Sequence, residues 1–571
     1  MIKTIFRLIP KKKHISFYWL IFLFIIGGIL ETLGVGLFIP ILNSISNEMN
    51  LSIPIIDSIA NYVFENIKIL NFEATILFFL VIIFLVKNLI LLYTIRFQNK
   101  FLKDFFLILS NNLLKKYLSQ NYIFFVKNNS SKLIRNLSTD LLLLQATIVS
   151  LLVFISKFVI FLGILTLLLI VNFKVTLYGT LVLCLLFFLL NKFTKTATVN
   201  WGKKRHYFSS QWLKNLQQSF ASINILKVYN AENYFLKNYD SSIEKVFESA
   251  RKHDNLQGVP TLFFEIIILL TLSIFCIYYF SLGYSFISIV PLVSFYFISA
   301  LRVGPTGVHM YKSLVSFNFA KKTINQLKKE FELKSKISKQ DDIKAKFKKS
   351  IVFKNLSFRY DNDTPNVLNK INIKFKKNDY VGIIGPSGSG KTTFIGLLIG
   401  LIKQNSGKIL IDNKEVDNQS KEWIDRVGYV PQNTYLLDAS IKENIAFGKF
   451  NDQIDLKRVN DSIKKTQLNK FINRLSKKIN SNVGERGSRI SEGQKQRIGI
   501  ARALYKKSDI LVFDEITSAL DILTEKKIMR DINKLKNKKT IFFISHKKEI
   551  LGKCNKIIEI KGGKIRIIKN V

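Results

Sequence analysis

Residues 385–392 have the types and spacing of a phosphate-binding loop. They read Gly-Pro-Ser-Gly-Ser-Gly-Lys-Thr and follow an apolar run, 380–384, that has the composition of a strand. Glycines let backbone N–H groups curl around phosphates, a lysine there reaches the terminal phosphates, and the next hydroxyl can bind Mg²⁺. The sequence therefore predicts a nucleoside triphosphate site made by Gly385, Pro386, Ser387, Gly388, Ser389, Gly390, Lys391, Thr392 and Thr393.

The N-terminal half of the chain is apolar enough to lie in a membrane. Hydrophobic residues make up 48% of the sequence, and residues 1–315 hold several stretches of the roughly 20 apolar residues that a bilayer-crossing helix needs. No small-residue cleavage site follows the first stretch, so it is predicted as a span and not as a signal peptide. We predict six spans, at about 16–43, 74–96, 148–171, 175–193, 260–281 and 285–313.

Positive charge is unevenly distributed along the chain. The formal net charge is +45, and basic residues are concentrated in the first 14 residues and in the segments 96–140 and 192–256. Because cytoplasmic loops of membrane proteins are enriched in lysine and arginine, we expect both termini and these two loops in the cytoplasm. No basic helix with interleaved aromatic residues stands out, so no nucleic-acid partner is predicted. We expect an integral protein of a bacterial inner membrane.

A polar, lysine-rich stretch at 320–348 separates the apolar half from the phosphate-binding loop. Beyond it, the chain alternates between helical segments and strand-like runs at 351–359, 380–384, 510–513 and 540–544. This alternation predicts an α/β fold around a largely parallel sheet. The predicted organisation is therefore an α-helical six-span transmembrane domain (1–319), a linker (320–348) and an α/β P-loop NTPase domain (349–571).

Downstream of the loop, the sequence resembles an ATP-binding cassette (ABC) domain. The matching positions come in the family's order: Tyr360, where the family stacks an aromatic ring on adenine, then Gln432, Val-Gly-Glu-Arg-Gly at 483–487, Asp514 and Glu515 after Ile-Leu-Val-Phe, Ser-Ala-Leu-Asp at 518–521, and His546. This ordered co-occurrence is far more specific than any single match. The resemblance implies an ATP hydrolase that uses Mg²⁺.

The resemblance also implies a role for each of these side chains. Asp514, Thr392 and Gln432 would bind Mg²⁺, since a carboxylate at the tip of a buried strand can hold the ion beside the β- and γ-phosphates. Glu515 would act as the general base toward the attacking water. Gln432 and His546 would be further catalytic residues, and His546 would steady the γ-phosphate.

The signature motif departs from the family pattern at one position. It reads Ile-Ser-Glu-Gly-Gln at 490–494, where the family usually has Leu-Ser-Gly-Gly-Gln. The resemblance implies contacts with the ATP of the opposite subunit from Ser491, Gly493, Gln494 and Asp521. Glu492 puts a carboxylate near a triphosphate, and we expect it to slow turnover unless it points away. One chain carries one P-loop and one signature motif, so we predict a homodimer, with a heterodimer as the alternative.

Six spans followed by one cassette resemble an ABC exporter half-transporter. Two basic segments, 122–140 and 223–240, look like the intracellular coupling segments that dock on the cassettes. Within the exporters, Glu31-Thr-Leu-Gly with Pro40, and Arg302 with Pro305, resemble the lipid-linked oligosaccharide flippase branch. That branch also has an external amphipathic helix, and here a periodic apolar stripe predicts one, formed by Leu51, Ile55, Ile59, Val63 and Ile67.

Ionisable residues also fall within the predicted spans: Glu31, Lys87, Lys157, Glu265 and Arg302. Counted inward from the outer ends of the spans, each lies about 20–25 Å deep, so we expect them to form one belt. Charge inside a membrane is costly and marks either pairing or function. Two interpretations stay open. In the first, the charges pair with one another across helices, or some of them lie in cytoplasmic extensions of the helices. In the second, a surplus of positive charge lines a cavity for a phosphate or pyrophosphate headgroup.

The sequence as a whole indicates an ATP-driven exporter of an amphipathic membrane lipid. A lipid-linked glycan with an anionic pyrophosphate head fits the surplus of intramembrane cations. A peptide or drug exporter is one alternative, and it would favour an apolar cavity with no need for Arg302. A non-transporting, ATP-dependent membrane regulator is another.

Overall fold

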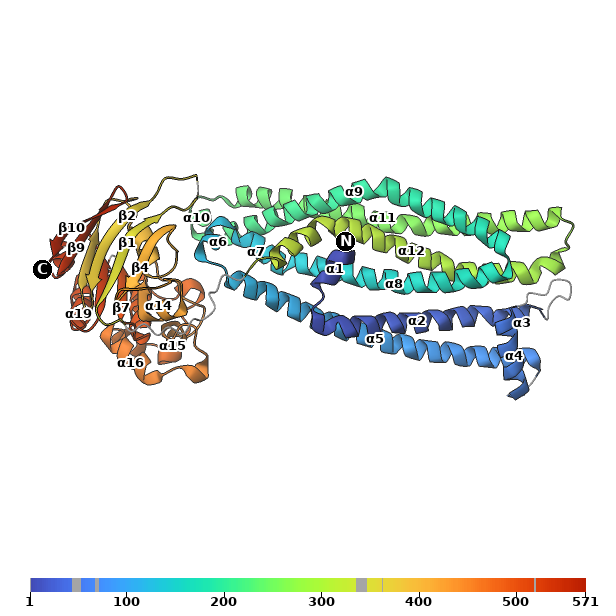
Figure 1. Ribbon diagram of the computed structural model, residues 1–571, viewed down its shortest axis with the longest axis horizontal. Helices are drawn as coiled ribbons and strands as arrows, with labels where there is room; N and C mark the ends of the chain where they lie inside the picture. The colour runs from blue at the N-terminus through green and yellow to red at the C-terminus, as the bar shows by residue number, and fades with distance from the viewer. Residues whose placement is uncertain are drawn as a thin grey trace. The chain divides into compact units, whose positions relative to one another are not determined.

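The computed structural model describes residues 2–43, 53–66, 71–334, 347–361, 363–517 and 520–570. These residues form two compact units (Figure 1). The first unit contains the described residues up to 119 and from 128 to 334. The second contains residues 120–127 and the described residues from 347 onward. The short helix α6 (Tyr122–Lys127) therefore belongs to the C-terminal unit.

The first unit is made of helices. Its long helices are α2 (His14–Gly36), α5 (Phe72–Leu118), α8 (Thr139–Val171), α9 (Phe173–Ala221), α11 (Glu232–Ser281) and α12 (Phe286–Phe331). The shorter ones are α1 (Ile2–Leu8), a 3-10 turn at Lys11–Lys13, α3 (Phe38–Asn43), α4 (Pro54–Asn66), α7 (Ser130–Leu137) and α10 (Ile223–Val228). Within the described residues, six helical segments are long and apolar enough to cross a membrane, and they confirm the six predicted spans.

Several of these helices are longer than the predicted spans. α5, α9 and α11 have 47, 49 and 50 residues, whereas crossing a bilayer takes about 20. The predicted spans at 74–96, 175–193 and 260–281 therefore cover only the apolar part of each helix. α12 continues to Phe331, so the first part of the stretch at 320–348 extends the last membrane helix, while 335–346 lie outside the described residues.

The helices of this unit pack around α12 and α8. α12 contacts α8, α9 and α11, and α2 contacts α8 and α5 (Figure 1). Gly202 allows α9 to approach α12 closely, because a Cβ at this position would lie 1.9 Å from the carbonyl oxygen of Phe319. At the start of α8, the fully buried Asp140 accepts a hydrogen bond from Arg135 Nε at 3.0 Å. A pair of this kind stays buried only because each charge has a partner.

The predicted amphipathic helix corresponds to α4, and its buried face includes part of the predicted stripe. Leu51 and Ile67 lie outside the described residues, as does the side chain of Ile55. The buried side chains of the helix are Ile56, Ala60 and Val63, which are spaced i, i+4, i+7 as one face of a helix requires. Of the predicted stripe, Val63 is buried and Ile59 packs partly buried against the core. Ile56 and Ala60 join them because a strict four-residue repeat drifts around a helix of 3.6 residues per turn.

The C-terminal unit contains two sheets. The first is four-stranded, in the order β2-β1-β4-β5, and its strands are β1 (Ser350–Phe358), β2 (Leu368–Lys376), β4 (Ser406–Ile411) and β5 (Lys414–Glu415). The second has the order β10-β9-β3-β8-β7-β6, with β3 (Tyr380–Ile384), β6 (Val427–Val430), β7 (Ile510–Asp514), β8 (Thr540–Ile544), β9 (Lys556–Lys561) and β10 (Lys564–Asn570). Neighbouring strands from β9 to β6 run parallel, which confirms the predicted α/β fold.

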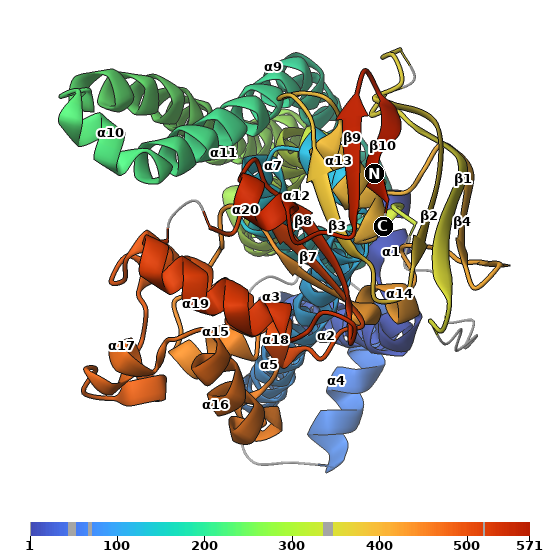
Figure 2. The same ribbon diagram turned by 90° about the vertical axis from the view of Figure 1, so that its left-hand side faces the viewer.

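Helices surround these sheets. They are α13 (Lys391–Leu398), α14 (Lys421–Arg426), α15 (Ile441–Ile445), α16 (Leu456–Lys465), α17 (Asn469–Asn473), α18 (Glu492–Tyr505), α19 (Ile522–Asn533) and α20 (Lys548–Leu551), with 3-10 turns at Asn451–Gln453, Lys478–Asn480 and Glu485–Gly487. In Figure 2, α15, α16, α17 and α18 gather on one side of this unit, away from the sheet that contains β1, β2 and β4.

The parallel strands bring distant segments to one edge of the second sheet. Ile383 at the end of β3 pairs with Ile544 at the end of β8, and Ile544 pairs with Asp514 at the end of β7. The loop after β3, the carboxylates after β7 and the turn after β8 therefore meet at the carboxyl ends of the strands. This edge is where open α/β sheets bind their ligands.

Candidate nucleotide site and charged membrane pocket

The loop between β3 and α13 has the backbone of a phosphate cradle. Gly385, Gly388 and Gly390 have φ angles of +151°, +76° and +103°, a region that glycine adopts readily and other residues rarely. A Cβ at Gly385 would lie 2.2 Å from the carbonyl oxygen of Ile560, so no larger residue fits there. The loop leads into the N-terminus of α13, whose free N–H groups and positive dipole end favour an anion.

Side chains around this loop also fit a nucleotide. Lys391 Nζ donates to the carbonyl oxygens of Gly385 and Pro386 at 2.6 and 2.8 Å, so the ammonium group lies over the loop. Within the described residues, Ser389 Oγ is buried with no hydrogen-bond partner. Tyr360 is 38% exposed, and its hydroxyl is 3.1 Å from Thr393 Oγ1, so the ring predicted to stack on adenine lies beside the loop helix.

The two predicted carboxylates lie at the tip of β7. Gln432 Nε2 donates to Glu515 Oε2 at 2.7 Å, and the hydroxyl of Tyr429 donates to Asp514 Oδ2 at 3.3 Å. Burial raises the pKa of Asp514 above its usual value, and the charge of Glu515 adds to this, while the Tyr429 hydrogen bond and the charge of Lys391 lower it. The field of Lys391 thus reaches Asp514, so the loop and the strand tip share one site.

Glu515 has a φ of +48°, in the left-handed region that non-glycine residues rarely occupy. Such backbone strain is typical of functional positions. Thr392 and His546 are exposed near the same edge, after β3 and β8. Within the described residues, no hydrogen bond joins His546 to Asp514 or Glu515. The fold brings the predicted catalytic residues to one edge, but it does not place His546 in contact with the carboxylates.

Sequence reasoning missed Tyr429. It lies in β6 opposite Val512 of β7 and donates its hydroxyl to the predicted Mg²⁺ ligand Asp514. The available signal was weak, because a single hydroxyl in an otherwise apolar strand has no motif around it.

The signature motif forms the N-terminus of α18. Ser491 is the N-cap: its Oγ accepts from Gln494 N at 3.3 Å, and Gln494 Oε1 accepts from Ser491 N at 3.0 Å. This capping box gives both residues a structural role in one chain. Glu492 Oε2 pairs with Lys495 Nζ at 3.1 Å along the side of the helix. Gly493 follows within the first turn, and the carbonyl of this glycine accepts from Arg497 at 3.4 Å.

Asp521 caps the next helix. Its side chain accepts from Thr524 N at 2.9 Å, and that hydrogen bond holds the pKa of Asp521 below its usual value. Residues 518 and 519 of the predicted Ser-Ala-Leu-Asp motif lie outside the described residues.

In the membrane unit, four of the five predicted charges line one cavity of about 290 Å³. Glu31 bridges two cations: its Oε2 is 2.7 Å from Lys87 Nζ, and its Oε1 is 3.2 Å from an Arg302 nitrogen. Both cations lie against the ring of Phe84. Lys157 also lines the cavity, and it makes no ion pair within the described residues. Three cations therefore surround one carboxylate.

Glu265, which was predicted to belong to the same belt, does not line this cavity. It lies on α11 and is exposed. Counting residues from the end of a span gives depth along the helix but not the direction in which the side chain points.

Comparison with known proteins decides the family. Residues 368–518 match the family model of the ABC transporter, and residues 17–305 match that of the ABC transporter transmembrane region. The chain belongs to the ABC transporter family. It contains the family's ATPase domain, which confirms the predicted α-helical membrane domain plus ABC cassette.

Several proteins are similar to this ABC transporter in sequence. The chloroplastic ABC transporter B family member 29 of Arabidopsis thaliana is 31% identical over 368 residues, which cover 64% of this chain and 58% of that protein. A putative export ATP-binding/permease protein of Rickettsia typhi is 40% identical over 219 residues, 38% of each chain. The leukotoxin translocation ATP-binding protein LktB of Mannheimia glucosida is 39% identical over 216 residues, 38% of this chain and 30% of that one. The chain thus spans less than two thirds of these relatives.

A solved structure matches the fold of nearly the whole transporter. The structure of a bacterial Atm1-family ABC exporter with ATP bound has a TM-score of 0.79 and covers 97% of this chain and 94% of that chain. Its sequence identity is 19%, so the match shows a shared fold. The resemblance to the lipid-linked oligosaccharide flippase branch stays a prediction.

Proposed function

We propose that this ABC transporter is an ATP-driven exporter that works as a homodimer and moves an amphipathic lipid with an anionic diphosphate head, such as a lipid-linked glycan. The observation that carries the substrate proposal is the charged cavity. Glu31 neutralises one of its two cationic partners, and Lys157 adds another positive charge. A diphosphate would supply the negative charge that this arrangement lacks.

The ATP site supports hydrolysis as the source of energy. Thr392, Gln432 and Asp514 would hold Mg²⁺, which when bound neutralises charge on the β- and γ-phosphates. Lys391 would leave the carbonyl groups of its own loop and turn toward the phosphates. Glu515 would orient the attacking water and accept its proton. For this, the hydrogen bond from Gln432 to Glu515 must first open, so ATP binding and release of the base are expected to be linked.

The coupling segments support the dimer. In the C-terminal unit, Ile123 of α6 packs against the cassette core and Lys127 pairs with Asp361. The second segment, α10, leaves apolar side chains uncovered: Ile225 is 63% exposed and Val228 is 78% exposed. We propose that α10 docks on the cassette of a second copy, and that each ATP lies between the P-loop of one copy and Ser491 of the other.

Flipping of a pyrophosphate-linked lipid in proteoliposomes tests the substrate proposal. Arg302→Ala and Lys157→Met should each reduce flipping at least about tenfold, equivalent to about 1.4 kcal/mol, while basal ATPase activity survives. Glu265→Gln is the matched control, because it removes an exposed charge of the same unit outside the cavity. Undiminished flipping by both cavity variants would favour the peptide or drug exporter.

ATP turnover tests the catalytic part. Glu515→Gln should keep ATP binding, lose hydrolysis and trap a cassette dimer, whereas Lys391→Ala should weaken ATP binding itself. Full ATPase activity in Glu515→Gln would show that Glu515 is not the general base. Hydrolysis that no lipid, peptide or drug stimulates would instead favour the non-transporting regulator.

A further inference from the structure

An apolar groove runs between α5 and α12 in the membrane unit. It has a volume of about 630 Å³, and its lining comes from residues 80–88 of α5, residues 298–302 of α12 and Phe38 of α3. Leu80, Val81 and Leu85 form its wall on α5. Within the described residues, Arg302 is the one charged side chain that lines it.

This groove and the charged cavity share part of their lining. Leu301 and Arg302 line both spaces. On α12 the lining passes from Ile298 in the groove, through these two residues, to Pro305 in the cavity, and residues at this spacing lie on one face of a helix. On α5 the lining of the groove ends at Asn88, and that of the cavity begins at the neighbouring Lys87. The two spaces therefore follow one another along the same two helices.

Phe84 marks the junction between them. Its ring lines the groove, and the ring centroid is 4.3 Å from Lys87 Nζ and 5.7 Å from the guanidinium carbon of Arg302. The Arg302 side chain is 43% exposed although Nη1 is 3.2 Å from Glu31 Oε1, so part of the guanidinium remains open to a ligand. An anion held by these cations would thus have its neighbouring atoms at the apolar wall of the groove.

The order of the two spaces along α12 matches the orientation of a lipid in one leaflet. The groove lies toward the start of α12 at Phe286, and the cavity lies toward its end at Phe331, after which the sequence leads to the cassette. A lipid with its head in the cavity and its tail in the groove would point its head toward the cassette end of this helix. With the cassette in the cytoplasm, as we expect, this is how a lipid of the cytoplasmic leaflet is oriented.

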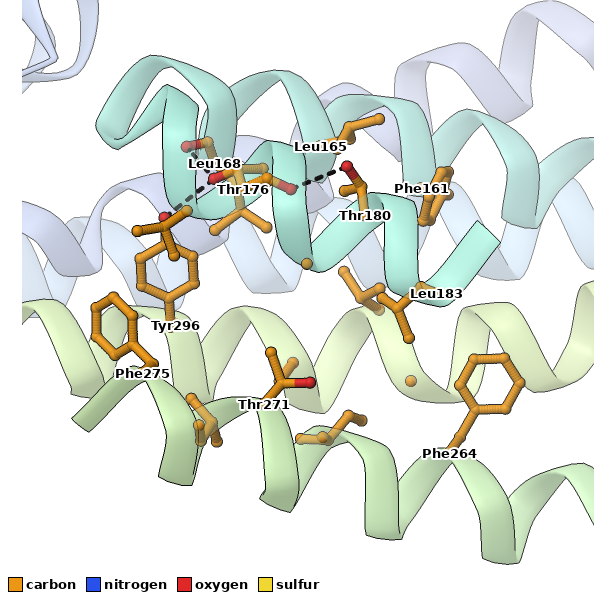
Figure 3. Close-up of a pocket in the computed structure, with 17 residues that line it drawn as sticks. Phe161, Leu165, Leu168, Thr176, Thr180, Leu183, Phe264, Thr271, Phe275 and Tyr296 are labelled. Carbon is orange, nitrogen blue, oxygen red and sulfur yellow. Dashed lines mark hydrogen bonds between the residues drawn. The ribbon is translucent and has the colours of Figure 1, made fainter. Parts of the chain in front are cut away.

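A smaller apolar pocket does not continue the charged cavity. It has a volume of about 110 Å³ and lies among α8, α9, α11 and α12. Figure 3 shows Leu165, Leu183 and Thr271 around this space. Within the part of the chain that the structure describes, its lining includes none of the residues that line the charged cavity.

We propose that the groove between α5 and α12 holds the hydrocarbon tail of the transported lipid, a proposal that rests on the proposed function of the charged cavity. Its volume is about four times the roughly 150 Å³ of an apolar cavity that holds benzene, so it has room for a tail segment of about twenty carbons. Lipid tails are as apolar as the groove, so the tail gains little transfer energy there. Occupancy of the groove by this tail must therefore depend on the head.

Photolabelling of the full-length transporter in proteoliposomes tests this dependence. The two probes are lipids with the same prenyl tail, which carries a diazirine; one has a pyrophosphate head and the other a neutral hydroxyl. Saturating ADP occupies the phosphate loop between β3 and α13, so that loop is not open to the pyrophosphate head. Mass spectrometry then locates the labelled residues. Leu185 of α9, which is 59% exposed and outside both spaces, is the reference for general contact with lipid.

Relative to Leu185, the pyrophosphate lipid should label Val81 and Leu85 at least about tenfold more than the neutral lipid does, the factor that about 1.4 kcal/mol of charge-assisted binding gives. Lys157→Met should lower this ratio, because Lys157 lines the charged cavity but not the groove. Glu265→Gln is the matched control and should leave the ratio unchanged. A change in the cavity can alter label in the groove in this way only if one lipid occupies both.

Four results would overturn the tail groove. Equal labelling by the two lipids would show that bulk bilayer lipid fills it, and no label from either would show that protein, such as a second copy of the chain, covers it. Head-dependent label on Leu165 or Leu183 instead would place the tail in the pocket of Figure 3. A ratio that Lys157→Met leaves unchanged would separate the groove from the charged cavity.

Flipping of the same pyrophosphate lipid tests the proposed function separately. If wild-type protein does not flip it, or if Arg302→Ala and Lys157→Met both flip it as fast as wild type, the charged cavity is not a diphosphate site, and the tail groove falls with it. Flipping that these variants slow, together with equal labelling of the groove by the two lipids, would overturn only the tail groove.

Discussion

Lys87 and Lys157 line the same cavity but are in different electrostatic environments. Lys87 Nζ is 2.7 Å from Glu31 Oε2, and the Lys87 side chain is 12% exposed. Lys157 makes no ion pair within the described residues. Replacing each with methionine keeps an unbranched side chain of similar length and removes one positive charge. We expect the two substitutions to change the free energy of unfolding in opposite directions.

The expected sizes follow from the surroundings. Removing one partner of a buried ion pair costs about 3–5 kcal/mol. Arg302 remains 3.2 Å from Glu31, so Lys87→Met should fall below that range, at about 2 kcal/mol. An unpaired cation in a membrane segment costs about 2.5–3.5 kcal/mol. Lys157 lines a cavity and is only partly buried, so the cost is smaller here, and Lys157→Met should stabilise the protein by about 1 kcal/mol.

Unfolding in mixed micelles with increasing SDS, followed by tryptophan fluorescence, measures both differences. The double variant Glu31→Gln/Lys87→Met should recover most of the loss in Lys87→Met, since no uncompensated carboxylate remains. Lys157→Met should be more stable than wild type yet flip a pyrophosphate-linked lipid more slowly. Equal destabilisation by Lys87→Met and Lys157→Met would refute the distinction between a paired structural cation and an unpaired binding cation.

Three further predictions concern the remaining sites. Tyr429→Phe removes a hydrogen bond that lowers the pKa of Asp514, so the pKa of Asp514 should rise further. Because the carboxylate form is needed to hold Mg²⁺, the acidic limb of the pH profile of ATPase activity should move to higher pH. An acidic limb at the same pH as in wild type would count against this role of Tyr429. Glu492→Gly should leave turnover unchanged or raise it, because Glu492 pairs along the helix side, and a fall of more than about tenfold, or about 1.4 kcal/mol of barrier, would contradict this. Gly202→Ala forces a methyl group against the Phe319 carbonyl and should cost about 1–3 kcal/mol of stability, measured by the same SDS titration.

The nucleotide site could be predicted from the sequence because its parts are local. The phosphate loop is contiguous, and Asp514 ends an apolar run that can only be a buried strand. Parallel strands then bring separate segments to one sheet edge without further information. Tyr429 escaped prediction because its contact with Asp514 runs between neighbouring strands that are about eighty residues apart in the sequence.

The membrane unit was predictable in number of spans but not in the rotation of its helices. Hydropathy indicates which part of a helix is surrounded by lipid, so the six spans could be predicted from it. The polar continuations of α5, α9 and α11 have no such signal and were not predicted. Depth counting brought Glu31 and Lys157 to one level correctly. It placed Glu265 there too, although that side chain points elsewhere, because rotation about the helix axis depends on packing partners that the sequence does not show.

The capping box at Ser491 has a consequence for how a nucleotide would be recognised. A hydroxyl has one proton to donate and two lone pairs. In α18, one lone pair of Ser491 Oγ is engaged by the N–H of Gln494, and this fixes the oxygen at the helix tip. The hydroxyl proton remains to be donated outward, alongside the unpaired N–H groups of the first turn. The same interaction that begins the helix therefore orients a hydrogen-bond donor before any phosphate arrives, so little conformational entropy is lost when one binds.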